Sequence, residues 1–354
     1  MSKYLKADIL PVEVIFHPSW WFKHTGITFD EDFFYDPLKR VESEKRMEKE
    51  LYNRFGKYGP GKDKDKELPV IGAVHNAAGY LISELLGCKV NYFEDSAPQV
   101  YSAHHEELKI YSDDVFKTAP FKKLESLLGK LKSKYGYLYG DINWGGILNC
   151  ALDLQSEKIF TDFFEKPAEI RDYLNRISQV IEKFTTYIMK ETGTTSLSVN
   201  RIVYHFDKPV FLHSECSHTM ISVEDYENFM LPFDIEWSQK FRPFGIHYCG
   251  VDPHRMAESY ARIPHLDFMD VGWGGDLKIL RKHLPGTFLN IRLSPVEIIN
   301  QTKDEIRETI IRLVMESGNP SLTGVCCINM DDKVEDDKVI EIFKTVEELR
   351  KRYR

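Results

Sequence analysis

The sequence lacks the features that mark several large classes of protein. Basic residues are not in excess, and the formal net charge of -8 argues against a nucleic-acid-binding protein. No run of about 18 apolar residues occurs, so we expect no membrane span. The first residues, MSKYLKADILPVEVIF, lack the apolar core of a signal peptide. These absences predict a cytoplasmic chain whose partners are neither nucleic acids nor membranes.

Cysteine and nucleotide-binding motifs are also scarce. Six cysteines are spread over 354 residues, which is not a disulfide framework and fits a reducing compartment that keeps some thiols for metal binding or chemistry. No G-x-G-x-x-G follows the first predicted strand, and no P-loop lysine motif is found. Nucleotide binding is therefore a weak interpretation.

What the sequence does contain is an alternation of strands and helices. The clearest helix falls in 165–193, where apolar residues recur every three or four positions. The predicted strands lie in LPVIGAV, YLYGDINW, PVFLHSEC, FGIHYCG, FMDVGWG, TFLNIRL and LTGVCCI. Such alternation requires a parallel sheet, for which a closed (β/α)8 TIM barrel is our first choice and a doubly wound sheet our second. We interpret residues 1–65 as a helical, aromatic extension that packs on a barrel domain of residues 66–354.

Soft metal ligands occur at the predicted strand ends, where a barrel of this kind carries its chemistry. His247 and Cys249 in HYC point to the same side, because alternate residues of a strand share a face. A third thiol from the CC pair at 326–327 would complete a three-ligand zinc site with one open position, the arrangement of catalytic zinc. The alternative is that these cysteines are buried apolar thiols of the core.

Other polar residues near strand ends are candidates for catalysis or substrate binding. His213 and Glu215 share a strand face and could orient a zinc ligand or donate a proton to a leaving group. Asp141 and Asn143 also share a face, and we take the first as catalytic and the second as substrate-binding. His75 could orient substrate, although a partly buried structural histidine is an equal alternative.

Beyond these residues, the chain resembles the uroporphyrinogen decarboxylase superfamily, in its corrinoid-linked methyltransferase branch. That branch carries H-x-C followed by a later cysteine in a G-x-C or P-G-C stretch, and here HYC is followed by GVCCI. The stretches ISVEDYENFMLPF, NIRLSPVEIINQTKDEIRE and GDINWGGILNCALDL are similar to further segments of the family. The resemblance covers roughly residues 65 to 354 and implies a TIM barrel with an N-terminal helical extension.

The resemblance implies a zinc-dependent methyltransferase. Its zinc ligands map onto His247, Cys249 and Cys326, with Cys327 where the family has glycine. Asp270, 21 residues after Cys249, is a candidate fourth ligand, and Glu215 is the alternative. The methyl group would pass to the Co(I) corrinoid of a separate corrinoid protein, because this chain has no D-x-H-x-x-G cobalamin motif. Transfer from a methylcorrinoid to a thiol such as coenzyme M is the alternative direction, and a homodimer is left open.

The N-terminal segment bears on the substrate. Trp20 and Trp21 head a group of aromatic residues that could cap the barrel mouth and bind an aromatic methyl ether. The simpler interpretation is that these aromatic residues pack the extension against the barrel. The segment is aromatic and acidic, without the arginines with which true uroporphyrinogen decarboxylases bind a polycarboxylated substrate, so a decarboxylase-type lyase is the least favoured activity.

Overall fold

The structure is a computed structural model that describes residues 9–63, 69–71, 80–110, 112–140, 145–193 and 205–354. The predicted site residues His75, Asp141 and Asn143 lie outside these ranges. No helix within them is long and apolar enough to cross a membrane.

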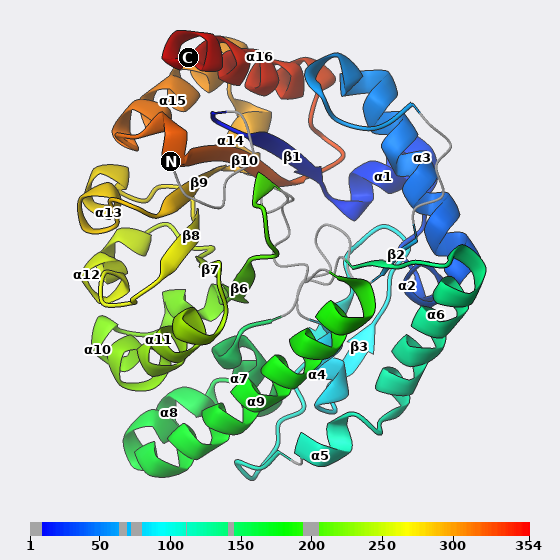
Figure 1. The fold of residues 1–354 in the computed structure, drawn as a ribbon, viewed down its shortest axis with the longest axis vertical. Coiled ribbons are helices and arrows are strands. Elements are labelled where there is room, and N and C mark those ends of the chain that lie inside the picture. Colours follow the sequence, from blue (N-terminus) through cyan, green and yellow to red (C-terminus); the bar gives the residue numbers. More distant parts are fainter. Residues whose placement is uncertain (1–8, 64–68, 72–79, 111, 141–144, 194–204) are drawn as a thin grey trace.

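A curled sheet of six parallel strands forms the centre of the molecule (Figure 1). Its spatial order is β1-β10-β9-β8-β7-β6. The strands are β1 (Val12–Phe16), β6 (Phe211–Ser214), β7 (Phe244–His247), β8 (Leu266–Val271), β9 (Phe288–Leu293) and β10 (Thr323–Met330). Each connection between successive strands from β6 to β10 contains helix, as parallel pairing requires.

Two small sheets complete the described strands. β2 (Val70–Ile71) pairs in parallel with β5 (Tyr139–Gly140), and β3 (Lys89–Asn91) pairs antiparallel with β4 (Gln99–Tyr101). Within the described ranges no ladder joins the β2–β5 pair to β1 or to β6. The predicted α/β class and parallel sheet are thus confirmed. The sheet is a curled half-barrel, and the closed eight-stranded barrel stays a prediction.

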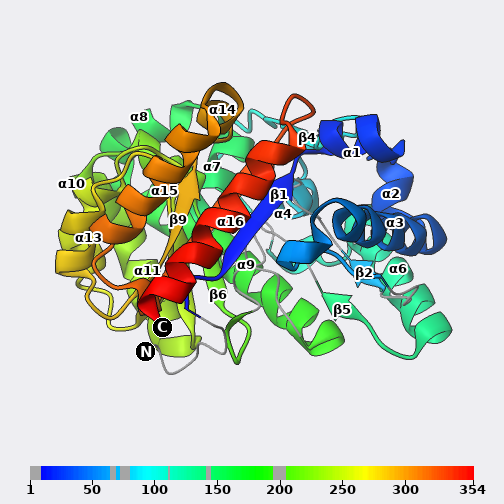
Figure 2. The same cartoon turned by 90° about the horizontal axis from the view of Figure 1, so that it is seen from above.

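The helices lie outside the curled sheet (Figure 1), and Figure 2 shows α16 running beside β1. In the amino-terminal half they are α1 (Pro18–Thr25), α2 (Glu31–Tyr35), α3 (Pro37–Phe55), α4 (Tyr80–Leu85), α5 (Ser112–Val115), α6 (Ala119–Tyr135), α7 (Ile147–Gln155), α8 (Lys158–Glu165) and α9 (Pro167–Thr192). In the carboxy-terminal half they are α10 (Val223–Asp225), α11 (Leu231–Lys240), α12 (Ala257–Tyr260), α13 (Leu277–His283), α14 (Pro295–Asn300), α15 (Lys303–Glu316) and α16 (Asp336–Tyr353).

Local sequence signals explain several helix boundaries. Thr302 and Glu305 form the predicted capping box at the start of α15. The helix predicted at 221–241 is opened by Ser222, whose hydroxyl accepts from the Asp225 backbone. It does not run evenly, because a π-helical turn (Tyr226–Met230) separates α10 from α11. Pro232 lies in the first turn of α11, so its missing N–H falls where the helix restarts.

The amino terminus departs from the predicted division of the chain. β1 lies within the segment that we interpreted as an extension, yet it pairs with β10 as an edge of the main sheet. The helices that follow it, α1 to α3, match the predicted helical character. The predicted boundary at residue 65 therefore separates a strand from the sheet to which it belongs. VEVIF was missed because its short run of apolar residues carries no helix or turn signal beside it.

Candidate metal centre

A row of polar side chains crosses the inner face of the sheet. The register aligns Ser214 with His247, His247 with Asp270, and Asp270 with Asn290. Nδ1 of His247 lies 2.8 Å from Oδ2 of Asp270, and Nδ2 of Asn290 donates to Oδ1 of Asp270 at 2.6 Å. The aspartate therefore fixes the imidazole so that its other nitrogen, Nε2, is the one available to a ligand.

Below this row the inner face is apolar. Leu212, Phe268 and Phe288 come from three strands of the sheet and pack with Phe206 and Val210. Gly245 on β7 lies among them, where an added Cβ would meet a methyl group of Leu212 at 2.9 Å. The polar row thus rests on a filled base and faces the carboxyl ends of the strands, where chemistry is expected in such folds.

Two thiols lie next to the His247 imidazole, toward the carboxyl ends of the strands. They belong to Cys216 and Cys249, each two residues past a member of the polar row. Sγ of Cys249 lies 2.7 Å from Nε2 of His247 and 2.7 Å from Sγ of Cys216. The three ligand atoms all lie within 4.8 Å of one another. His247 is buried, whereas both cysteines are partly exposed. Two thiols and one imidazole with access to solvent fit zinc held by three protein ligands with a position left over.

The electrostatics of this group prepare Cys249 to act as a metal ligand. The hydrogen bond from the Cys216 thiol holds the pKa of Cys249 well below its usual range, against the effect of burial, and the His247 imidazole adds to this. Burial lowers the pKa of His247, but the Cys249 thiolate and Asp270 more than offset it and raise the value to about 9. The neighbours of Cys249 therefore favour its thiolate, which is the form that binds a metal, whereas His247 would have to release a proton on binding one.

Two of the predicted ligands, Cys326 and Asp270, are absent from this group of three ligand atoms. Cys326 lies outside the cluster: it is the fourth residue of β10, and its Sγ accepts from Asn290 at 3.3 Å. β10 is three strands away from β7 in the sheet order. β6, which leads to Cys216, lies directly beside β7. Asp270 is a hydrogen-bond partner of the ligand histidine and is absent from the group of ligand atoms. Cys216 is the third member of the group, where we had expected Cys326.

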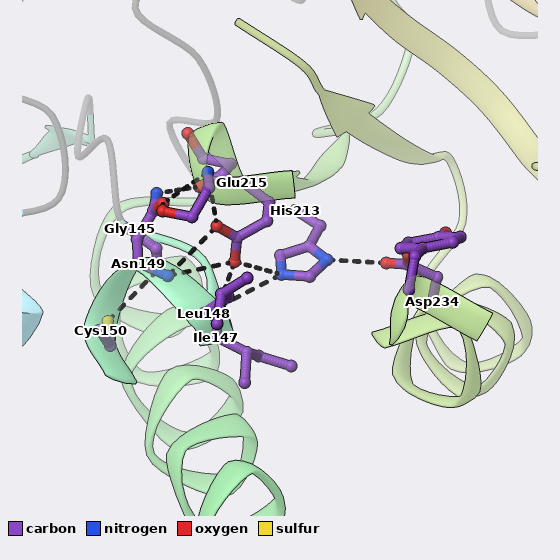
Figure 3. A network of polar contacts seen from close by, with 11 residues as sticks. Gly145, Ile147, Leu148, Asn149, Cys150, His213, Glu215 and Asp234 are labelled. Carbon is purple, nitrogen blue, oxygen red and sulfur yellow. Dashed lines mark hydrogen bonds and ion pairs between the residues drawn. The ribbon is translucent and has the colours of Figure 1, made fainter. Parts of the chain in front are cut away.

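His213 and Glu215 lie on the opposite face of β6, away from the thiols. Nδ1 of His213 is 2.7 Å from Oδ1 of Asp234 on α11, and its Nε2 is 3.5 Å from Oε2 of Glu215 (Figure 3). All three side chains are fully buried. The prediction that His213 and Glu215 share a face is correct. That face, however, is the one that packs against helices.

Glu215 has the contacts of a structural cap. Its carboxylate accepts from the backbone N–H groups of Leu148 and Asn149 at the start of α7, at 2.7 and 3.2 Å (Figure 3). It also accepts from the backbone of Ser217, at 3.1 Å. An acidic group at a helix N-terminus stabilises unpaired N–H groups. Glu215 thus holds the turn that carries Cys216 against α7, and its predicted role as a proton donor has no substrate-facing atom in this arrangement.

Trp20 and Trp21, the predicted substrate-binding residues, are core residues here. Both are 0% exposed. Trp20 stacks on Phe16 with ring centroids 4.0 Å apart, and Trp21 meets Trp20 edge-on at 4.8 Å. Buried aromatic clusters of this kind contribute mainly to packing. They attach α1 to β1, in agreement with the simpler of the two interpretations.

Comparisons with known proteins extend only to the fold. No protein-family model and no curated protein matches the sequence. A solved structure of a methyltransferase from Methanosarcina mazei matches with a TM-score of 0.68 and 12% identity, over 97% of this chain and 95% of that one. A B12-independent methionine synthase from a Shewanella species, in complex with selenomethionine, matches with a TM-score of 0.53 and 8% identity, over 98% and 99%. The chain shares its fold with both proteins.

Sequence reasoning missed Cys216, although a signal was present. Cys216 follows the strand in PVFLHSEC just as Cys249 follows the strand in FGIHYCG. Because Ser214 pairs with His247, the cysteines two residues further along each chain come opposite each other. That register could not be read from the sequence, since it depends on how two neighbouring strands align.

Proposed function

We propose that the chain is a metal-dependent methyltransferase that takes a methyl group from a small methylated substrate, with an aromatic methyl ether as the favoured donor. The observation that carries this proposal is the partly exposed group Cys216–His247–Cys249. The similarity in fold to a methyltransferase supports it but says nothing about substrate or partner. We further propose that the acceptor is the Co(I) corrinoid of a separate protein, which the sequence resemblance implies.

The donor set of the site fits zinc. Thiolate and imidazole ligands suit this ion, and three of them leave one coordination position for a substrate. Zinc bound there would supply Lewis acidity that makes the substrate oxygen a better leaving group. Cys326 is buried in an apolar cluster and bonded to Asn290, so we do not count it among the ligands.

The chain's own residues would prepare the site for this chemistry. Asp270 orients His247 through Nδ1, and Asn290 in turn holds Asp270. Glu215 fixes the turn that begins with Cys216 against the start of α7. In the proposed reaction the methyl carbon leaves its oxygen and bonds to the partner's cobalt, and the phenolate product gains a proton from solvent.

The test measures metal content first and methyl transfer second. Protein purified anaerobically is expected to hold about one zinc ion per chain, and Cys216→Ala and Cys249→Ala are expected to lose it. With cob(I)alamin and a panel of methoxylated aromatic compounds, the metal-loaded protein should form methylcobalamin and the corresponding phenol. Cys326→Ala is the matched control and should keep the metal.

Two outcomes would count against the proposal. Protein that neither contains zinc nor binds it on addition would mean that the thiols are only partly buried core residues. A decarboxylase-type lyase would then become the favoured activity. Metal-loaded protein that transfers no methyl group from any ether, but methylates coenzyme M from methylcobalamin, would reverse the direction of transfer.

A further inference from the structure

A buried arginine, whose nearest anionic neighbour is the Cys249 thiolate, lies beside the candidate metal centre. Arg292, the fifth of six residues in β9, is 3% exposed. Nε and Nη1 have no hydrogen-bond partner in the described part of the chain. Burying a guanidinium is strongly unfavourable unless its N–H groups are bonded, and natural buried arginines are almost always paired.

The register places Arg292 on the same level as the two thiols. Asn290 belongs to the polar row with Asp270 and His247, and Arg292 follows it by two residues on the same face. Cys249 follows His247 by two residues in the same way. The matching position between them is Gly272, one residue past the end of β8. It has no side chain and lies so close to the backbone of Gly250 that it could not carry one. No side chain from β8 therefore separates Cys249 from Arg292.

The electrostatics agree with this position. Burial by itself lowers the pKa of Arg292, but the neighbouring Cys249 and then Cys326 more than offset this effect and raise it. On its other side the guanidinium lies 5.2 Å from the centre of the Trp273 ring, which is half-buried in the turn after β8. A metal ion would neutralise the charge of the thiolates and leave the unbonded N–H groups of Arg292 for another anion.

We propose that Arg292 binds an anionic group, a carboxylate or a sulfonate, of the methyl-bearing substrate beside the Cys216–His247–Cys249 group. The inference rests on the proposed function and narrows its substrate class to methylated acids. A guanidinium suits such oxyanions because its planar N–H groups match their geometry. Trp273, next to it, offers a flat apolar surface for the body of the substrate.

The experiment compares an acid with its neutral counterpart in binding. Isothermal titration of zinc-loaded protein with 4-methoxybenzoate and with 4-methoxybenzamide should give at least about ten-fold tighter binding of the acid, as expected for a charge-assisted contact. Arg292→Met should abolish this preference, and Arg292→Lys should keep part of it. Zinc content and circular dichroism are measured on each variant. Arg312→Met, which changes an exposed arginine on α15, is the matched control and should behave like the wild type.

Binding of benzoate and of ethanesulfonate, which carry no transferable methyl group, tests the anion site independently of the proposed function. Comparing the two affinities shows whether the site prefers a carboxylate or a sulfonate. Binding of either that depends on Arg292 supports the anion site even if no ether donates a methyl group, in which case the proposed function fails alone. Equal affinity for acid and amide in the wild type would overturn the inference, as would a preference that survives in Arg292→Met. If neutral ethers donate their methyl group as fast as acids do, the proposed function is supported and the proposed anion-binding role of Arg292 is wrong.

Discussion

Two histidine–carboxylate pairs lie on opposite faces of neighbouring strands, and they differ in what surrounds them. His247 with Asp270 faces the inside of the sheet, and His213 with Asp234 faces the helices. The pKa of each histidine is raised to about 9: burial lowers it in both, and the neighbouring negative groups more than compensate. The pair by itself therefore does not identify a functional site.

The surroundings make the distinction. The inner pair adjoins two partly exposed thiols, which are ligands and nucleophiles. The outer pair adjoins Tyr226 and His218, which are both fully buried. The possible ligand atoms of His213, His218 and Asp234 also lie within 4.8 Å of one another. It contains no soft ligand and has no contact with solvent. We therefore expect the inner pair to serve metal binding and the outer pair to serve stability, and four measurements test that separation.

The largest expected effect is on stability, from removing the carboxylate of the outer pair. Asp234→Ala would leave a buried imidazole and the Tyr226 hydroxyl without their acceptor, which is 2.7 and 2.6 Å away in the wild type. We expect a loss of about 3–5 kcal/mol in the free energy of unfolding, typical of breaking a buried ion pair. Urea unfolding measures it. An unchanged midpoint would mean that the outer pair contributes nothing to stability.

The next effect is a dependence of stability on pH that belongs to the outer pair. The folded-state pKa of His213 is raised to about 9, above the value of 6.5 for a free histidine. Its contribution is therefore fully present below about pH 6.5 and is lost as the pH rises through about 9.

A shift of this size corresponds to about 3 kcal/mol. We expect the difference in unfolding free energy between wild type and Asp234→Asn, both metal-free, to shrink by about this amount over the same window. A difference that stays constant from pH 6 to 10 would contradict the assignment to His213.

Changing the carboxylate of the inner pair should act on the metal. Asp270→Asn would weaken the orientation of His247 and its basicity as a ligand, and we expect metal affinity to fall by about 10- to 100-fold. Competition with a chromophoric chelator measures the affinity. Asp234→Asn is the matched control, since it removes the same charge from the outer pair and should leave affinity unchanged. Equal effects of both substitutions would break the proposed separation.

The smallest expected effect comes from a single hydrogen bond of the outer pair. Tyr226→Phe keeps the ring in the core and removes only the hydroxyl that donates to Asp234 at 2.6 Å. A hydrogen bond to a charged group contributes about 1.5–3 kcal/mol, and we expect a loss near the lower value because the carboxylate keeps its bond to His213. Thermal unfolding at constant pH measures it. A larger loss than that of Asp234→Ala would mean that the tyrosine, not the ion pair, is the main support.

Much of the fold followed from patterns that act over short distances. The strands around FGIHYCG and TFLNIRL, the helix at 165–193 and the capping box at Thr302 and Glu305 all appear close to where they were predicted. Apolar periodicity and capping depend on neighbours within a turn or two, so the sequence contains them directly. The role of His247 and Cys249 as a pair follows in the same way, from the alternation of side chains along one strand.

What the sequence by itself determined is therefore a parallel α/β fold and an H-x-C pair at a strand end, both written in residues close together in the chain. Only the tertiary structure decided that Cys216 and not Cys326 meets this pair, that His213 and Glu215 face the helices, and that Arg292 lies beside Cys249. The physical reason is that these relations depend on strand order and register. Both are fixed by packing between segments distant in the chain, and neither is encoded in the spacing of the residues that they bring together.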